Sequence, residues 1–153
     1  MKATSYIIIF ILFSTALPLQ AARINNISNL NFGSLTASPF GNIIKIDASG
    51  GEKSPVIISG IGHLSGGSSG RIQFVPDQSG QRVHIDYPVS FSISNSVDSM
   101  IINQIGINSC TDFTANSTSP VDVYIGGVLT ISPAQATGNY SGSTTINITI
   151  NNP

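Results

Sequence analysis

Frequent glycine and proline residues divide this chain into short segments, and this punctuation limits what it can fold into. The 153 residues include 15 glycines and 8 prolines. After residue 21, no stretch sustains a helical period for more than about two turns. Short alternating or β-branched apolar runs recur instead. They cover residues 26–32, 42–47, 56–64, 71–75, 82–87, 89–94, 99–107 and two runs within 124–150. This pattern predicts about eight or nine short β-strands.

Alternation within these runs predicts strands with one buried face. In residues 82–86, Val83 and Ile85 alternate with charged or polar side chains, as in a strand that covers a core on one side. We therefore expect an all-β fold, an antiparallel β-sandwich. Residues 99–107 are expected to form a hairpin with residues 89–94, and Pro88 to mark an edge or a kink.

The first 21 residues have the features of a secretory signal peptide. Lys2 gives a short positive region, the apolar run at residues 6–17 is too short to span a bilayer, and Ala21 is a small residue suited to cleavage. An uncleaved membrane anchor is the alternative interpretation. We predict that residues 1–21 are removed and that residues 22–153 form a single domain, exported to the periplasm, the cell surface or the medium. No second apolar segment follows, so no transmembrane segment is expected after cleavage.

Composition narrows the range of partners. Only 8% of the residues are charged and the formal net charge is −1, so no basic patch is expected and nucleic acid is a poor partner. Cys110 is the single cysteine, so it has no internal disulfide partner. We expect its thiol to be buried as a small apolar group; pairing with another chain is the alternative.

One motif formally suggests a hydrolase. Residues 66–70 match the G-x-S-x-G nucleophile elbow around Ser68, and Asp77 and His84 follow in the order of an α/β hydrolase. The elbow requires a sharp turn from a strand into a helix, whereas a strand pattern that ends in proline follows Ser68. We therefore predict a protein that is not an enzyme and has no catalytic residues.

Metal ligands are not clustered in the sequence either. His63 and His84 are the only histidines, and Asp98, Asp112 and Asp122 are scattered. No ligand-like spacing or calcium-binding loop occurs, so we predict no metal site and no cofactor.

The last passage of the chain, residues 124–150, has the most readable pattern. Gly126 and Gly127 interrupt a strand pattern, which indicates a bulge or a close backbone approach. The Tyr140 hydroxyl is placed to tie down the preceding loop, with simple packing as the alternative. Ile146, Ile148 and Ile150 alternate with polar residues, so one strand face should bury all three, each contributing roughly 1.5–3 kcal/mol.

Several motifs resemble those of a known bacterial family. These are the "LNFGSL" at residues 30–35, "GRIQFV" at 70–75, "VHIDYP" at 83–88, and the passage that contains Gly126-Gly127-x-Leu129 and "GNYSG" at 138–142. In this order they resemble DUF4402, whose exported members look like fimbrial subunits. The resemblance implies an immunoglobulin-like, pilin-type sandwich with a structural or adhesive role, and it supplies no catalytic residues.

The function expected from these observations is that of an exported, non-enzymatic surface protein that acts through β-strand and sheet-edge interactions. Its partners would be copies of itself, other surface subunits and a periplasmic chaperone. Only residues 22–29 precede the first motif, and Ile24 and Ile27 have spacing three rather than two, which disfavours a donated N-terminal strand. Residues 23–32 as a whole are the alternative donor, if the first strand is itself donated. The alternative is a monomeric secreted module that binds a glycan or a host surface.

Overall fold

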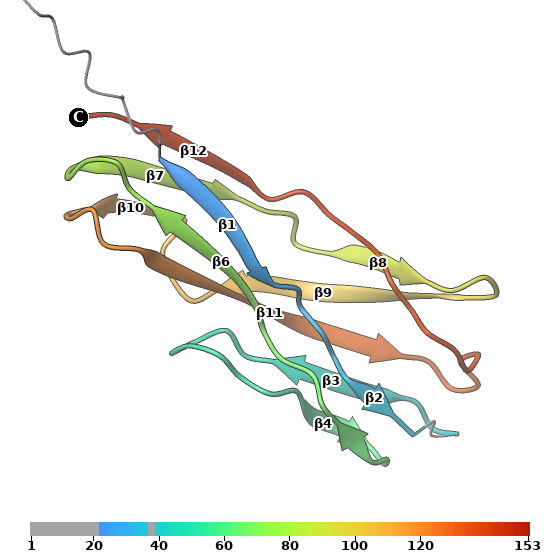
Figure 1. The fold of residues 1–153 in the computed structure, drawn as a ribbon. Coiled ribbons are helices and arrows are strands. Elements are labelled where there is room, and N and C mark those ends of the chain that lie inside the picture. The colour runs from blue at the N-terminus through green and yellow to red at the C-terminus, as the bar shows by residue number, and fades with distance from the viewer. Residues whose placement is uncertain (1–21, 37–38) are drawn as a thin grey trace, which may run out of the picture.

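The computed structural model describes residues 22–36 and 39–153, and these residues form strands and no helix (Figure 1). The all-β prediction is confirmed, but the number of strands is twelve. The strands are β1 (Arg23–Ser28), β2 (Ser34–Leu35), β3 (Asn42–Ile46), β4 (Val56–Gly60), β5 (Leu64–Ser65), β6 (Gly70–Val75), β7 (Gln81–Asp86), β8 (Phe91–Ser94), β9 (Ser99–Ile107), β10 (Asp112–Ala115), β11 (Val121–Ile131) and β12 (Asn147–Asn151). The predicted signal peptide, residues 1–21, lies outside the described residues.

The strands beyond the nine predicted runs are β2, β5 and β10. β10 lies between the predicted runs and pairs with β7, whereas β2 and β5 have a local cause. The predicted run 56–64 is broken at Gly60, whose φ of 103° only glycine adopts easily. It becomes β4 and the two-residue strand β5, which pairs with β2. All pairings between the strands are antiparallel.

The long strand β11 organises a seven-stranded sheet. Residues 121–125 of β11 pair with β6, and residues 127–131 pair with β3 further along the same edge. β1 continues the sheet beyond β6, and β4 continues it beyond β3. The opposite edge of β11 pairs with β9, which forms the predicted hairpin with β8.

The two central glycines of β11 lie where its partner changes from β3 to β6. A Cβ on Gly126 would collide with the carbonyl oxygen of Ile46 and lie 2.9 Å from the backbone nitrogen of Ala48. The pairing with β9 also shifts register between Gly126 and Val128. Both predicted features, a bulge and a close backbone approach, are therefore present.

A second layer covers part of this sheet. Strands β10, β7 and β12 form a three-stranded sheet with β7 in the centre. Its inward side chains share one apolar cluster with β6 and β11, so the two sheets pack in a sandwich-like arrangement. The buried members of the cluster are Phe74, Val83, Ile85, Ala115 and Val123. The alternation predicted for residues 82–86 is confirmed, and Pro88 lies where the chain passes from this sheet to β8 of the larger one.

The three isoleucines of the last strand face inward, but they are not fully buried. Ile146, Ile148 and Ile150 are half-buried against this cluster. Ile148 and Ile150 lie on β12, and Ile146 lies directly before it. β12 pairs only with β7 among the described strands, so one of its edges has no partner strand. The predicted face is correct, and the predicted degree of burial is too high.

The other half of the larger sheet is covered by irregular chain rather than by strands. A second cluster with Ile44, Ile46, Ile102 and Leu129 at its centre includes Phe32 from the segment after β1. Tyr140, from the segment between β11 and β12, packs against it. β11 and β12 do not pair with each other, because the segment between them crosses from one sheet to the other.

Candidate functional site: a groove between the two end segments

The serine motif does not form a nucleophile elbow. Ser68 precedes β6 rather than a helix, and its backbone forms an antiparallel bridge with Asn31, with N–O distances of 2.8 and 2.9 Å. Asp77 lies in the bend after β6. His84, on β7, is hydrogen-bonded to Asp112 instead, with 2.7 Å between Nδ1 and Oδ1. In the described part of the chain, no hydrogen bond joins Ser68, Asp77 and His84.

The glycine and serine loop has a packing role in the structure. The Ser69 side chain is completely buried, and its Oγ accepts a hydrogen bond from the backbone N–H of Lys53 at 3.1 Å. A Cβ on Gly67 would lie 2.7 Å from the carbonyl oxygen of Asn31. Small residues here allow the segment after β1 to cross close to the loop.

The histidines and acidic residues do not gather around a common point. His63 and His84 are both exposed. Within residues 22–36 and 39–153, no group of three or more His, Cys, Asp or Glu side chains is arranged to hold a metal ion.

One polar cluster lies on the outer face of β6 and β11. The Arg71 guanidinium donates to Asp122 at 2.7 Å, and Gln73 donates to the other carboxylate oxygen at 3.2 Å. The hydrogen bond from Arg71 lowers the pKa of Asp122. Arg71 also lies 5.8 Å from the centre of the Tyr124 ring. These contacts link two neighbouring strands, and among the described residues the buried Arg71 Nε has no hydrogen-bond partner.

The expectation that Cys110 is buried was wrong. Its side chain is exposed, because it lies in the short turn between β9 and β10, among polar residues that give no apolar cover. The thiol is therefore accessible to other molecules.

A groove of about 1010 Å³ lies on the inner face of the seven-stranded sheet. One side is formed by residues 24–35, which we call the N-terminal wall. The other side is formed by residues 135–146, the C-terminal wall. The floor between them is almost entirely apolar and includes Ile44, Ile72, Ile102, Ile125, Leu129 and Ile131.

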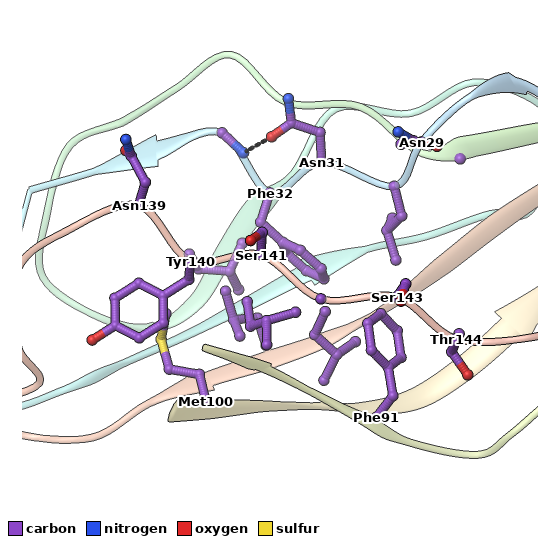
Figure 2. Close-up of a pocket in the computed structure, with 18 of the residues that line it drawn as sticks. Asn29, Asn31, Phe32, Phe91, Met100, Asn139, Tyr140, Ser141, Ser143 and Thr144 are labelled. Atoms are coloured by element: carbon purple, nitrogen blue, oxygen red, sulfur yellow. Dashed lines mark hydrogen bonds between the residues drawn. The ribbon is translucent and has the colours of Figure 1, made fainter. Parts of the chain in front are cut away.

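The N-terminal wall is anchored by Phe32 and shaped by Gly33. Phe32 is buried in the core and points into the space below its segment (Figure 2). Gly33 has a φ of 77° and a Cβ there would lie 2.5 Å from the Ser65 carbonyl oxygen. The Asn31 side chain accepts a hydrogen bond from the Gly33 N–H at 2.8 Å. The "LNFG" sequence thus places this wall.

The C-terminal wall is anchored by Tyr140. Its hydroxyl donates to the carbonyl oxygen of Ala136 at 2.7 Å and accepts from Gln135 at 3.2 Å, so the predicted tie to the preceding loop is confirmed. Ser141 forms a two-way backbone bridge with Ser94 of β8. The "GNYSG" sequence therefore attaches this wall to the edge of the larger sheet.

Each wall ends at a strand edge that has no partner strand in the described structure. β1 pairs with β6 on one side only, and β12 pairs with β7 on one side only. Between Ser141 and β12, residues 142–146 have no regular secondary structure. Among the described residues, no backbone–backbone hydrogen bond outside the strand ladders involves residues 143–146. In Figure 1, β1 and the chain leading into β12 run in opposite directions. Residues of both segments line the groove.

Sequence reasoning identified the residues that hold the walls, but it did not predict the groove. Phe32, Gly33 and Tyr140 stand out as motif residues. The floor residues have the ordinary alternation of core strands, and nothing local distinguishes them from fully covered ones. Exposure of Ile24, at 47%, is the sign of incomplete cover, and it becomes visible only when the two sheets are placed together.

Comparison with known proteins assigns the chain to a family. The described residues contain no helix that is long and apolar enough to cross a membrane. Comparisons with curated proteins and with solved structures found no match. A family model described as "Domain of unknown function (DUF4402)" matches residues 23–151 and so covers both sheets and both walls of the groove. The chain therefore belongs to the DUF4402 family.

Proposed function

We propose that this chain is an exported, non-enzymatic structural or adhesive protein of the bacterial surface, similar to a fimbrial subunit, and that it works through β-strand and sheet-edge interactions. The observation that carries the proposal is the groove lined by β1 on one side and by residues 135–146, which lead into β12, on the other. Among the described strands, β1 and β12 each have one edge without a partner strand. Open edges present rows of unpaired N–H and C=O groups that can bind another strand.

The edges carry little of the charge that usually protects against such pairing, although β1 has a register irregularity between Asn26 and Ser28. Natural proteins protect exposed edges with lysine, proline or inward-pointing charges. β1 has one charged residue, Arg23, at its start, and β12 has none. Isoleucines occupy the remaining large side-chain positions of both strands. This arrangement supports association with another chain rather than a monomeric state in solution.

The test is the state of the protein on the cells that make it. An epitope-tagged full-length chain is expressed, and material sheared from the cell surface is run on SDS gels with and without boiling. We expect heat-labile species larger than the single chain, because strand-paired complexes resist SDS until heated. A chain found only as a monomer in the medium would contradict the proposal and favour a solitary binding module.

A further inference from the structure

We infer that a second hollow, at the end of the smaller sheet, binds two adjacent hydroxyl groups of a hexose in a glycan. The hollow has a volume of about 460 Å³ and shares only Thr144 with the groove described above. The inference rests on the adhesive part of the proposed function and assigns its ligand class. The residues that line the hollow are Asp86, Tyr87, Pro88, Thr144, Thr145 and Asn147.

The hollow exists because two segments part between two points where they are paired. At one point Asn147 pairs with Asp86 in the ladder between β12 and β7. At the other point the C-terminal wall forms its backbone bridge with β8. Seven residues (87–93) connect these points on one segment, whereas five (142–146) connect them on the other. Two extra residues interrupt the ladder, as in a β-bulge, and Pro88 has no N–H to donate to it.

The polar side chains of this hollow have no partners of their own. In the part of the chain that the structure describes, the side chains of Asp86, Thr145 and Asn147 form no hydrogen bond or ion pair. By contrast, Asp122 and Asp112 each bond a neighbouring basic side chain at 2.7 Å. The hydrogen-bonding capacity of the hollow is therefore available to a ligand.

The arrangement of these groups fits a diol. Asp86 and Asn147 lie directly opposite each other on neighbouring strands, so their Cβ atoms are about 5 Å apart. The carboxylate accepts hydrogen bonds from hydroxyl groups, whereas the amide both donates and accepts. The hydroxyl of Thr145, two residues before Asn147, adds a further group that donates and accepts. Adjacent sugar hydroxyls require such a mixture, because each of them is both a donor and an acceptor.

The same residues disfavour other ligand classes. The carboxylate of Asp86 repels an anion, and within residues 22–36 and 39–153 no group of three His, Cys, Asp or Glu side chains is placed to hold a metal ion. Pro88 and the Tyr87 ring offer apolar surface to the C–H face of a sugar. Tyr87 packs against both apolar clusters of the fold, so this surface is fixed before a ligand binds. The volume lies within the range of about 300–1,000 Å³ that is typical of small-molecule sites.

The experiment titrates isotope-labelled protein of residues 22–153 with the methyl glycosides of glucose, galactose, mannose, fucose and N-acetylglucosamine. Proton–nitrogen correlation spectra follow the backbone amides. We expect at least one glycoside to shift the amides of residues 86, 87 and 144–147 in a saturable way. Monodeoxy analogues of that glycoside should bind about tenfold more weakly only where one of two neighbouring hydroxyls is absent.

Single substitutions locate the site. Asp86→Asn removes the charged acceptor and should weaken binding at least about tenfold, because hydrogen bonds to an ionised group are the stronger ones. Asn147→Ala should have a similar effect. Asp112→Asn is the matched control, since Asp112 belongs to the same sheet, is also exposed and does not line the hollow. It should leave binding unchanged.

Two columns distinguish the sources of the sugar, because host glycans and the polysaccharides of the producing cell both carry such diols. Retention on immobilised mucin, with release by the best glycoside, would assign the ligand to a host. Retention on immobilised polysaccharide of the producing strain would assign it to the cell's own surface.

Three results would overturn the inference: no saturable shift with any glycoside, retention on neither column, or equal loss of binding in Asp112→Asn and Asp86→Asn. The proposed function is tested separately, because the heat-labile complexes on SDS gels depend on sheet edges and not on this carboxylate. Such complexes without glycoside binding would overturn the sugar site alone. Glycoside binding by a chain that is only a monomer would support the sugar site and contradict the proposed association.

Discussion

Adding a single methyl group at Gly126 should destabilise the fold, because it forces β11 away from the end of β3. In Gly126→Ala, the new Cβ would overlap the Ile46 carbonyl oxygen and crowd the Ala48 nitrogen, both of which are backbone atoms. Relief requires β3 or β11 to move by roughly 1 Å, and such overpacking typically costs about 1–3 kcal/mol. Alanine also lowers the conformational entropy of the unfolded chain relative to glycine, which stabilises the folded state by about 0.5 kcal/mol. We expect a net loss of about 2 kcal/mol.

Two neighbouring glycines provide matched controls. Gly106, which pairs with Gly126 across the β9–β11 ladder, would place a Cβ in open space. Gly106→Ala should therefore stabilise by about 0.5 kcal/mol. A Cβ on Gly127 would meet side-chain methyl groups of Ile102 and Ile105 at 3.0 and 3.1 Å, and the backbone oxygen of Asn103 only at the ordinary contact distance of 3.4 Å. These ends can shift, so Gly127→Ala should fall between the other two.

Urea unfolding followed by far-ultraviolet circular dichroism measures the series, and thermal melts give a second estimate. At about 4 °C per kcal/mol for a domain of this size, Gly126→Ala should lower Tm by about 8 °C and Gly106→Ala should raise it by about 2 °C. Equal stabilities of the Gly126 and Gly106 variants would refute the reasoning, because it depends entirely on the proximity of the end of β3.

Four further predictions follow from single side chains. Phe74→Ala should destabilise by about 3–5 kcal/mol in urea titrations, because Phe74 is 1% exposed and its loss leaves a cavity. Tyr140→Phe should cost about 1 kcal/mol in the same assay, through the lost hydrogen bond that holds the C-terminal wall. Cys110 should react with Ellman's reagent in the native protein as fast as in urea, since it is exposed; slow native reaction would contradict this placement. Arg71 lowers the pKa of Asp122, so the stability that the carboxylate contributes is present above its unfolded pKa of about 3.9 and is lost as the pH falls through its lower folded pKa. The stability difference between wild type and Asp122→Asn should therefore be constant near neutral pH and shrink below about pH 4.

Local pattern was sufficient to predict most strands, because a strand with one buried face needs alternation and a turn residue at each end. Strand β9 begins and ends where the apolar run 99–107 does, and β3 and β6 each lie within one residue of their predicted runs. The glycine pair in β11 was also readable, since adjacent glycines in a strand imply that something approaches too closely for a side chain. These features depend on residues that are near in sequence.

The remaining features depend on partners that are distant in sequence. Alternation in residues 146–150 indicates which side chains face inward, but it does not say that β12 pairs with β7 rather than with β11. Cys110 follows the same logic, because its exposure is set by the turn between two sheets and not by its own apolar character. Burial was overestimated in both cases for one reason. A sequence shows which residues prefer to be covered, but not whether a covering element reaches them.

The mismatch between the two layers explains why the groove exists. Seven strands present their inner face to three strands, so half of an apolar surface has no sheet to cover it. Phe32 and Tyr140 each pin an irregular segment over that half, yet irregular segments do not form a ladder with each other, and a gap of about 1010 Å³ stays between them. The two segments nevertheless cover the side chains beneath them, since Ile44, Ile102 and Leu129 are only 1%, 3% and 4% exposed, so irregular chain takes the place of strands as the second layer over this half of the sheet.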